Sequence, residues 1–159
     1  MLSIKKSKIP GAGKGLFAEK LFKRGDKVVE YLGEIVSWAE CLKRNSKIKN
    51  GIGTYYFYIN ERKCIDAQYS VNEFARYAND AAGFVRIEGV RNNSFYQVDK
   101  GKAYIVASRN IKIGDEIFVA YGKEYWDALR ENDLDKKVKR KKKNVSESLH
   151  PAAKRMAQH

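Results

Sequence analysis

The residues of this sequence that could do chemistry are above all tyrosines. There are ten of them, and Tyr31 and Tyr121 each end an apolar run directly before a glycine turn, in YLG and YG. Tyr55 and Tyr96 lie in other strand-like segments. Phenol rings that line a narrow channel can hold an alkyl-ammonium group by cation–π contact. For each tyrosine the alternative is simple packing, with the hydroxyl group reaching solvent.

Histidine is absent from the part of the sequence that has a globular pattern. The two histidines, His150 and His159, stand near the C-terminus. Their position excludes Ser–His and Cys–His nucleophilic catalysis in the domain and argues against a histidine-ligated metal. An enzyme built on this domain would have to work with tyrosine, carboxylate, lysine or positioning alone.

Two further stretches could bind a ligand. IPGAGKGLFAEK (9–20) holds three glycines in five positions, which lets a ligand approach the backbone closely. It matches neither a Walker loop nor a dinucleotide fingerprint, and a plain turn is the alternative. ARYANDAAG (75–83) places Arg76, Asn79 and Asp80 at the end of a short helix, where Asn and Asp are also ordinary helix-stop residues.

The elements that would position these residues are mostly short strands separated by glycine turns. Residue composition predicts the strands, and two S-x-x-E capping boxes predict where two of the helices begin. The predicted strands cover 15–20, 27–33, 54–59, 64–67, a hairpin of 93–99 with 103–109, and a last turn and strand over 111–121; the predicted helices cover 37–45, 70–78 and 123–132. The sequence therefore predicts a strand-dominated α+β domain.

Charge is unevenly distributed along the chain. The net charge is +13, and residues 136–159 alone carry nine Lys or Arg against one Glu. A run such as KKVKRKKK repels itself and cannot build a core, so we predict a domain over 1–132 and a basic, disordered tail over 133–159. The tail could bind nucleic acid non-specifically, act as a nuclear-import signal, or serve only as a solubilising extension.

The two cysteines, Cys41 and Cys64, are too few for a four-cysteine zinc site. We expect free thiols in a reducing compartment, with a single disulfide as the alternative. No apolar run is long enough to span a membrane, and the N-terminus lacks the apolar core of a signal peptide. These features together predict a soluble intracellular protein without a membrane partner.

Taken in order, the motifs resemble the SET domain of protein lysine methyltransferases. GKGLFA followed by RGDKVVEYLGE is similar to the family's G-x-G strand and Y-x-G-E motif. RYAND stands where the family has R-F-[IL]-N-H-S, and NIKIGDEIFVAYG resembles the closing I-x-x-G-E-E-L-x-x-x-Y-G. The similarity spans Lys6 to Trp126. It implies a SET-type fold of small curved β-sheets with short helices and a C-terminal pseudoknot.

The resemblance also implies an activity, the transfer of a methyl group from S-adenosylmethionine to a lysine nitrogen of a protein, with a histone tail as the expected substrate. Such an in-line displacement needs alignment, exclusion of water and charge stabilisation, and no metal. The expected location is the nucleus, or a host nucleus for a viral or bacterial effector, with the cytoplasm as the alternative. The competing function is a catalytically weak SET-like module that binds chromatin or nucleic acid.

Site residues follow from the resemblance, position by position. Tyr121 falls on the catalytic tyrosine and Tyr31 on the tyrosine that lines the lysine channel. Because Val119 stands two positions before Tyr121, Tyr96 is expected to supply the aromatic ring that limits the number of methyl groups, which favours mono- or dimethylation. The residues assigned to the cofactor are Lys14, Gly15 and Leu16 through their loop backbone, Tyr55 at its amino-acid end, Arg76, Asn79, Asp80, and Trp126 against the adenine.

The sequence departs from the family's pattern, and from what a basic substrate would suggest, at several points. Asp80 and Ala81 replace the usual His-Ser, which leaves cofactor affinity open and is the main support for the competing function. The mildly basic domain is not an obvious partner for a basic peptide, although Glu30, Glu34 and Asp66 could receive one. The wall of the lysine channel that other members build from cysteine-rich flanks would have to come from GKEYWDALREN (122–132).

Overall fold

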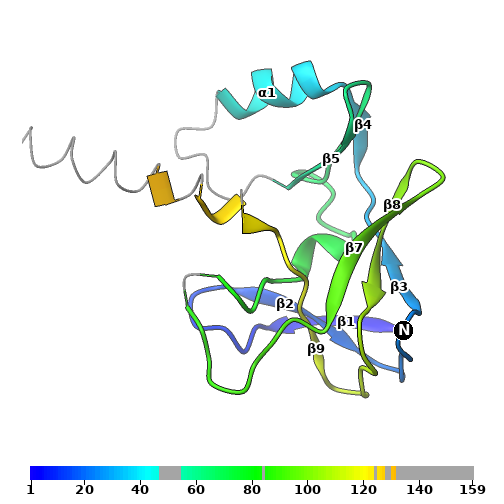
Figure 1. Cartoon of the computed structure of the whole chain (residues 1–159), viewed down its shortest axis with the longest axis vertical. Coiled ribbons are helices and arrows are strands. Elements are labelled where there is room, and N and C mark those ends of the chain that lie inside the picture. Colours follow the sequence, from blue (N-terminus) through cyan, green and yellow to red (C-terminus); the bar gives the residue numbers. More distant parts are fainter. Residues whose placement is uncertain (47–54, 84, 124, 128–129, 132–159) are drawn as a thin grey trace, which may run out of the picture. The chain divides into compact units, whose positions relative to one another are not determined.

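The computed structural model describes residues 1–46, 55–83, 85–123, 125–127 and 130–131 (Figure 1). The chain divides into two compact units, Met1–Tyr121 and Gly122–His159. The first unit is strand-dominated, as predicted, and its described strands form three small antiparallel sheets. The predicted basic tail lies outside the described residues, so the predicted boundary at residue 132 stays a prediction.

The first sheet carries the glycine-rich segment. It contains β1 (Leu2–Lys6), β2 (Lys14–Ala18) and β9 (Glu116–Ile117) in the order β1-β2-β9. Strand β2 is central, and every residue after Lys14 is buried. The register pairs Leu16 with both Ile4 and Ile117.

The second sheet contains β3 (Lys27–Glu30), β8 (Lys102–Ala107) and β7 (Ser94–Asp99) in the order β3-β8-β7. Its β7–β8 hairpin confirms the predicted one. Lys100 and Gly101 at the turn both have positive φ, 49° and 73°. Two positive φ values in a row match the right-handed twist of the flanking strands, which explains why this turn pairs them in register.

The third sheet contains β4 (Glu34–Val36), β6 (Lys63–Asp66) and β5 (Tyr56–Asn60) in the order β4-β6-β5, and it carries the helix α1 (Trp38–Ser46) (Figure 1). The capping box correctly predicted α1, because Ser37 Oγ accepts a hydrogen bond from the Glu40 backbone N–H at 3.2 Å. Cys41 of α1 meets Cys64 of β6, with the Sγ atoms 2.7 Å apart. Both are free thiols, as predicted, and both are fully buried.

The predicted helix over 70–78 is wrong. The segment makes successive i→i+3 turns and only a short 3₁₀ helix, η1 (Ala75–Tyr77). Asn72, Phe74 and Tyr77 are weak helix formers, and the Tyr77 hydroxyl group donates to the Val71 carbonyl at 2.7 Å, which stabilises the tighter path. Ser70 does not cap a helix; its carbonyl accepts a turn bond from Glu73 N instead.

Two turns of the same K-x-G-D pattern lie side by side and lead into the tyrosine-bearing segments. In the first turn Asp26 Oδ2 accepts from Lys23 N at 2.8 Å, and in the second Asp115 Oδ2 accepts from Lys112 N at 3.0 Å. Bonds between the residues just before each turn connect the two, because Phe22 forms an antiparallel bridge with Ile111. The first turn continues through β3 to Tyr31, and the second through β9 to Tyr121.

A hydrophobic core joins the three sheets. Its buried members come from β2, β3, β6, β8, β9 and η1, and Tyr31, Ile105, Ile117 and Val119 are among them. Among the described residues, no helix is long and apolar enough to cross a membrane.

Candidate active site

The segment that ends in Tyr121 runs between two strands from distant parts of the chain. Its backbone forms parallel bridges on one side with Asn79 and on the other with Ser94. Asn93 fixes the same segment through its side chain, because its Oδ1 accepts from Phe118 N at 2.9 Å and its Nδ2 donates to the Glu116 carbonyl at 2.8 Å. The predicted pseudoknot stays a prediction, since the chain beyond Tyr121 belongs to the second unit.

Tyr121 is anchored at both its backbone and its phenol. The hydroxyl group donates to the Ala78 carbonyl at 2.7 Å, and the backbone N–H donates to Asp80 Oδ2 at 2.9 Å. The ring is partly buried against the core. A phenol held in this way has a fixed position, which is the property that a residue needs to orient reacting groups.

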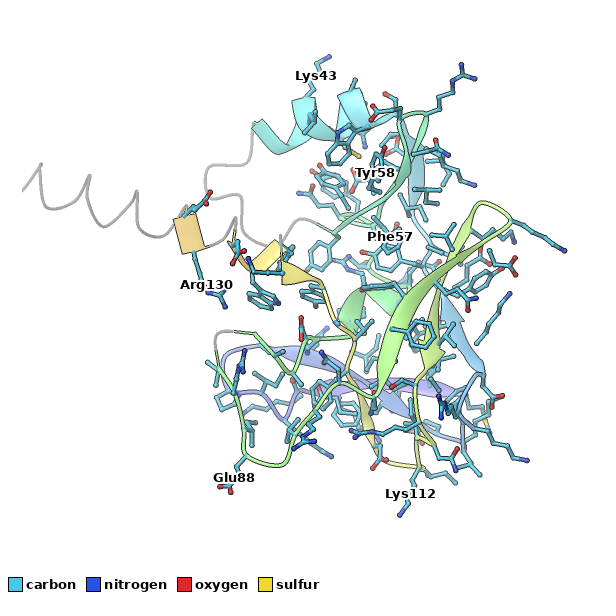
Figure 2. All side chains as sticks on the ribbon, in the orientation of Figure 1. Lys43, Phe57, Tyr58, Glu88, Lys112 and Arg130 are labelled. Atoms are coloured by element: carbon cyan, nitrogen blue, oxygen red, sulfur yellow. The ribbon has the colours of Figure 1, made fainter. Side chains whose placement is uncertain are left out.

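Tyr31 and Tyr96 form an aromatic cluster with Phe57. The ring centroids are 6.0 Å apart for Tyr31–Tyr96, 5.6 Å for Tyr31–Phe57 and 5.0 Å for Phe57–Tyr96. Figure 2 shows Phe57 where β5 approaches β7, the strand of Tyr96. Tyr96 and Tyr121 pack against the same core as the fully buried Val119. The cluster therefore contains two of the three tyrosines that the sequence assigned to catalysis, and the third, Tyr121, packs against the same core.

Tyr31 is a buried phenol. The side chain is buried, and this burial raises the pKa of Tyr31 well above its usual value. Its hydroxyl group donates to the Tyr55 carbonyl at 3.1 Å. Tyr31 is thus a fixed neutral wall of the cluster.

Arg76 lies near two tyrosine rings, with its guanidinium carbon 4.1 Å from the Tyr55 ring centroid and 5.3 Å from that of Tyr77. Its Nε and Nη1 atoms are buried and have no hydrogen-bond partner within the described part of the chain. A buried donor without an acceptor is costly. The site fits a ligand that brings a carboxylate, such as the amino-acid end of S-adenosylmethionine.

Lys14, Gly15 and Leu16 stand at the start of strand β2, which agrees with the strand predicted from residue 15 and differs from the loop that the resemblance implied for them. Leu16 is fully buried in the core, so its side chain is structural. Asn79 Nδ2 donates to the Lys14 carbonyl at 2.9 Å, which links this motif to the asparagine motif. The Lys14 ammonium group lies 5.8 Å from the centroid of the Tyr77 ring.

Gly15 faces a buried carboxylate that the sequence motifs do not single out. A Cβ atom at Gly15 would stand 2.2 Å from Glu116 Oε1. Glu116 accepts from Ser7 Oγ at 2.6 Å and from Lys8 N at 2.7 Å. The carboxylate thus ties the N-terminal segment to β9, and only glycine leaves room for it.

Asp80 is almost fully buried, and its carboxylate accepts three hydrogen bonds. Oδ2 accepts from Tyr121 N at 2.9 Å, and Oδ1 accepts from Ala82 N at 2.8 Å and from Asn92 Nδ2 at 2.9 Å. The residue that departs from the family's pattern therefore has a structural role inside the protein.

The three carboxylates that could receive a basic peptide already have basic partners in the chain. Arg44 of α1 binds Glu34 through two nitrogens, at 2.7 and 3.0 Å, and binds Asp66 at 2.9 Å. These contacts lower the pKa of Glu34 and raise that of Arg44. Glu30 lies 3.4 Å from the Lys102 ammonium group. The expectation that these residues form a free acidic site is not supported.

Trp126 belongs to the second unit, where residues 123, 125–127 and 130–131 are helical as predicted. Its ring is perpendicular to that of Tyr125, with centroids 5.1 Å apart. The predicted stacking of Trp126 on adenine, and the lysine-channel wall predicted from the same segment, stay predictions.

Sequence reasoning missed Phe57, Tyr77 and Asn92. Phe57 could have been found, because it shares the face of a period-2 strand with Tyr55. Tyr77 was hidden by the mistaken helix. Asn92 left no signal, since it acts through Asp80 across a loop.

The geometry supports a definite chemistry. A fixed phenol and a neutral aromatic cluster are suited to an alkyl-ammonium group or its neutral amine. The Arg76 guanidinium beside Tyr55 and the backbone around Lys14 are suited to a zwitterionic second ligand.

Comparison with protein families gives one family model, described as SET domain, which matches residues 13–122. The N-lysine methyltransferase KMT5A-A of Xenopus laevis is 31% identical over 125 residues, which cover 75% of this chain and 36% of that protein. The histone-lysine N-methyltransferase Set8 of Drosophila melanogaster is 26% identical over 124 residues, which cover 75% of this chain and 17% of that protein. The chain thus spans well under half the length of these relatives.

Among solved structures, an active polycomb repressive complex 2 in the basal state contains a similar chain. The TM-score is 0.61 at 26% identity, over 77% of this chain and 15% of that chain.

Proposed function

The chain belongs to the SET-domain family, and from that premise we propose that it transfers a methyl group from S-adenosylmethionine to the side-chain nitrogen of a lysine in a protein. The observation that carries the proposal is the double anchoring of Tyr121, whose phenol is held 2.7 Å from the Ala78 carbonyl and packs against the same core as Tyr31 and Tyr96. A fixed phenol in such a place can orient an amine without becoming a base.

The roles of the residues follow from their surroundings. S-adenosylmethionine supplies an activated methyl group on a sulfonium centre. Tyr31 and Phe57 form walls that exclude water, and Tyr121 orients the neutral lysine amine. Arg76 is suited to hold a carboxylate, and Lys14, Gly15 and Asn79 are suited to hold the remainder of the cofactor through backbone and amide groups. The lysine must lose its proton before its nitrogen attacks, and exclusion of water favours the neutral amine.

The substrate that we propose is a histone. The support is that Set8 of Drosophila melanogaster is named as a histone-lysine N-methyltransferase. Recognition of the basic peptide does not depend on free Glu30, Glu34 or Asp66 carboxylates, because these have partners in the chain. A nuclear location follows from a histone substrate, and the basic tail is suited to nuclear import or to contact with nucleic acid.

The competing function, a catalytically weak binding module, depended on Asp80. The structure gives this residue a role in holding Tyr121. No described contact favours the module over the enzyme.

The test is transfer of labelled methyl groups from S-adenosylmethionine to a panel of histones. We expect transfer by the natural chain and a loss of about a hundredfold or more in Tyr121→Phe, because a positioned hydroxyl group is removed. Tyr69→Phe is the matched control, since Tyr69 is 81% exposed. Absence of transfer to every histone, with no cofactor binding by calorimetry, would favour the binding module.

We also propose that Tyr96 limits the number of methyl groups. Its ring packs against Phe57 and Tyr31, and Val119 supplies no aromatic ring of its own. Tyr96→Phe removes a hydroxyl group and should move the products from mono- or dimethyl-lysine toward higher methylation, as measured by mass spectrometry. Tyr104→Phe, on the neighbouring strand β8, is the control. Unchanged product states in Tyr96→Phe would remove this assignment.

A further inference from the structure

We infer that Asp80 and Asn92 form a clamp that positions Tyr121, and that Asp80 does not serve as a contact for the cofactor. This inference rests on the proposed function, because it assigns a positioning role in the same reaction. It concerns the one motif position where the sequence departs from the family and adds a charge.

The Asp80 carboxylate is surrounded by donors. The three donors are the backbone N–H of Tyr121, the backbone N–H of Ala82 and the side-chain amide of Asn92, at 2.8–2.9 Å. An ionised carboxylate is the side-chain group that only accepts, and so it suits three donors at once. Hydrogen bonds to a charged acceptor are also about twice as strong as neutral ones.

Asn92 is itself held in a defined orientation. Its Oδ1 accepts from Ala81 N at 2.9 Å, which directs its Nδ2 toward Asp80. The two side chains therefore close the loop between residues 80 and 92 by reciprocal bonds. The next two residues, Asn93 and Ser94, bind the Phe118 backbone. Both ends of this loop thus hold the segment that leads to Tyr121.

The clamp completes the fixation of the phenol. The Tyr121 hydroxyl group is bound by Ala78 and the Tyr121 N–H by Asp80, so two residues of one short stretch hold both ends of the same tyrosine. Loss of the bond at the backbone would remove one of these two hydrogen bonds and loosen the position of the ring. Small displacements of a positioning group cost much activity even where the ligand still binds.

The test is a double-mutant cycle with Asp80→Asn, Asn92→Asp and the double swap. Asp80→Asn presents an NH₂ group to one of the three donors, and Asn92→Asp sets two carboxylates against each other. In the swap, the amide introduced at position 80 would accept from Tyr121 N and donate to the carboxylate introduced at position 92, which restores the main contacts. Ala82 N alone would lose its acceptor.

We expect each single variant to lower kcat by about tenfold to a hundredfold, the scale of one charged hydrogen bond, with the KM for S-adenosylmethionine little changed. The swap should recover much of the lost kcat. Asp99→Asn is the matched control, because Asp99 is an exposed turn carboxylate paired with Lys27, and it should leave kcat unchanged. A raised cofactor KM at constant kcat in Asp80→Asn, or single effects that simply add in the swap, would overturn the clamp.

A second measurement separates failure of the clamp from failure of the proposed function. Amide hydrogen exchange at Tyr121 needs no substrate, and the Asp80 bond should protect this amide in the natural chain. We expect faster exchange in Asp80→Asn and restored protection in the swap, at equal global stability. Unchanged exchange in Asp80→Asn contradicts the clamp, even if the methyl transfer is confirmed.

Discussion

Arg76 combines burial with guanidinium nitrogens that have no acceptor among the described residues. The rings of Tyr55 and Tyr77 stabilise its charge by cation–π contact, but they do not satisfy its N–H groups. The buried Nε and Nη1 atoms lie on different edges of the guanidinium plane, so each can donate to an acceptor that a ligand brings, and a carboxylate oxygen is a strong acceptor.

Arg76→Lys should therefore weaken binding of the cofactor more than it weakens catalysis. Lysine keeps the charge but loses the planar fork, so we expect the KM for S-adenosylmethionine to rise about tenfold or more with a smaller change in kcat. Arg62→Lys, at an exposed position after β5, is the control. Equal cofactor affinities in the Arg76 and Arg62 variants would show that the cofactor carboxylate binds elsewhere.

The residue scale also shows what a sequence can reveal of a site. Tyr31, Tyr96 and Arg76 were predicted from motif positions, and the structure brings each into the same core region. The role of Asp80 could not be predicted, because two of its three donors are backbone amides, which nearly every residue possesses. Glu34 and Asp66 form ion pairs with Arg44. These pairs could not be predicted, because no local sequence pattern relates Arg44 on α1 to either carboxylate.

At the scale of elements, the junction between β3 and β4 has little room. A Cβ atom at Gly33 would stand 2.5 Å from the Asp66 carbonyl oxygen and 2.7 Å from its carbon. Both atoms belong to the backbone of β6, so neither can rotate away. This close approach places the chain after Tyr31 directly against the third sheet.

Gly33→Ala should lower the free energy of unfolding by about 1–3 kcal/mol, the usual cost of overpacking, and should disturb the pairing of β4 with β6. Gly89→Ala is the comparison, because Gly89 has open space around it and its positive φ of 76° is the only obstacle. Urea denaturation of both variants checks the expectation. A loss in Gly33→Ala no larger than that in Gly89→Ala would mean that the backbone of β6 yields easily.

Elements were predicted well where their cause is local. The β7–β8 hairpin follows from its turn, and α1 follows from Ser37 and its capping bond. The helix over 70–78 was wrong because the Tyr77 hydroxyl group binds the Val71 carbonyl within the segment and Arg76 contacts the distant Tyr55 ring, and a capping box reveals neither contact. Both K-x-G-D turns were predicted as turns, but their similarity to each other was missed. The shared pattern is only four residues long, and it becomes clear only because a bridge joins the residues before the two turns.

At the scale of the whole molecule, the family and the strand-dominated class could be predicted, but the pairing of distant segments of the chain could not. The decisive contacts join Asn79 and Ser94 to the segment before Tyr121, and each spans a long stretch of sequence. Such pairings depend on the path of the entire chain. The order of the four motifs nevertheless indicated the family, which periodicity alone did not.

The buried thiol pair has a practical consequence for studying this protein. Cys41 and Cys64 are the only cysteines of the sequence, and both are sealed between α1 and β6. Burial also raises the pKa of each thiol, which slows attack on any electrophile further. A thiol-alkylating reagent in solution can thus reach Cys41 or Cys64 only after α1 detaches from its sheet. The rate at which these two natural thiols are alkylated therefore reports how often α1 detaches, and no label has to be engineered into the protein.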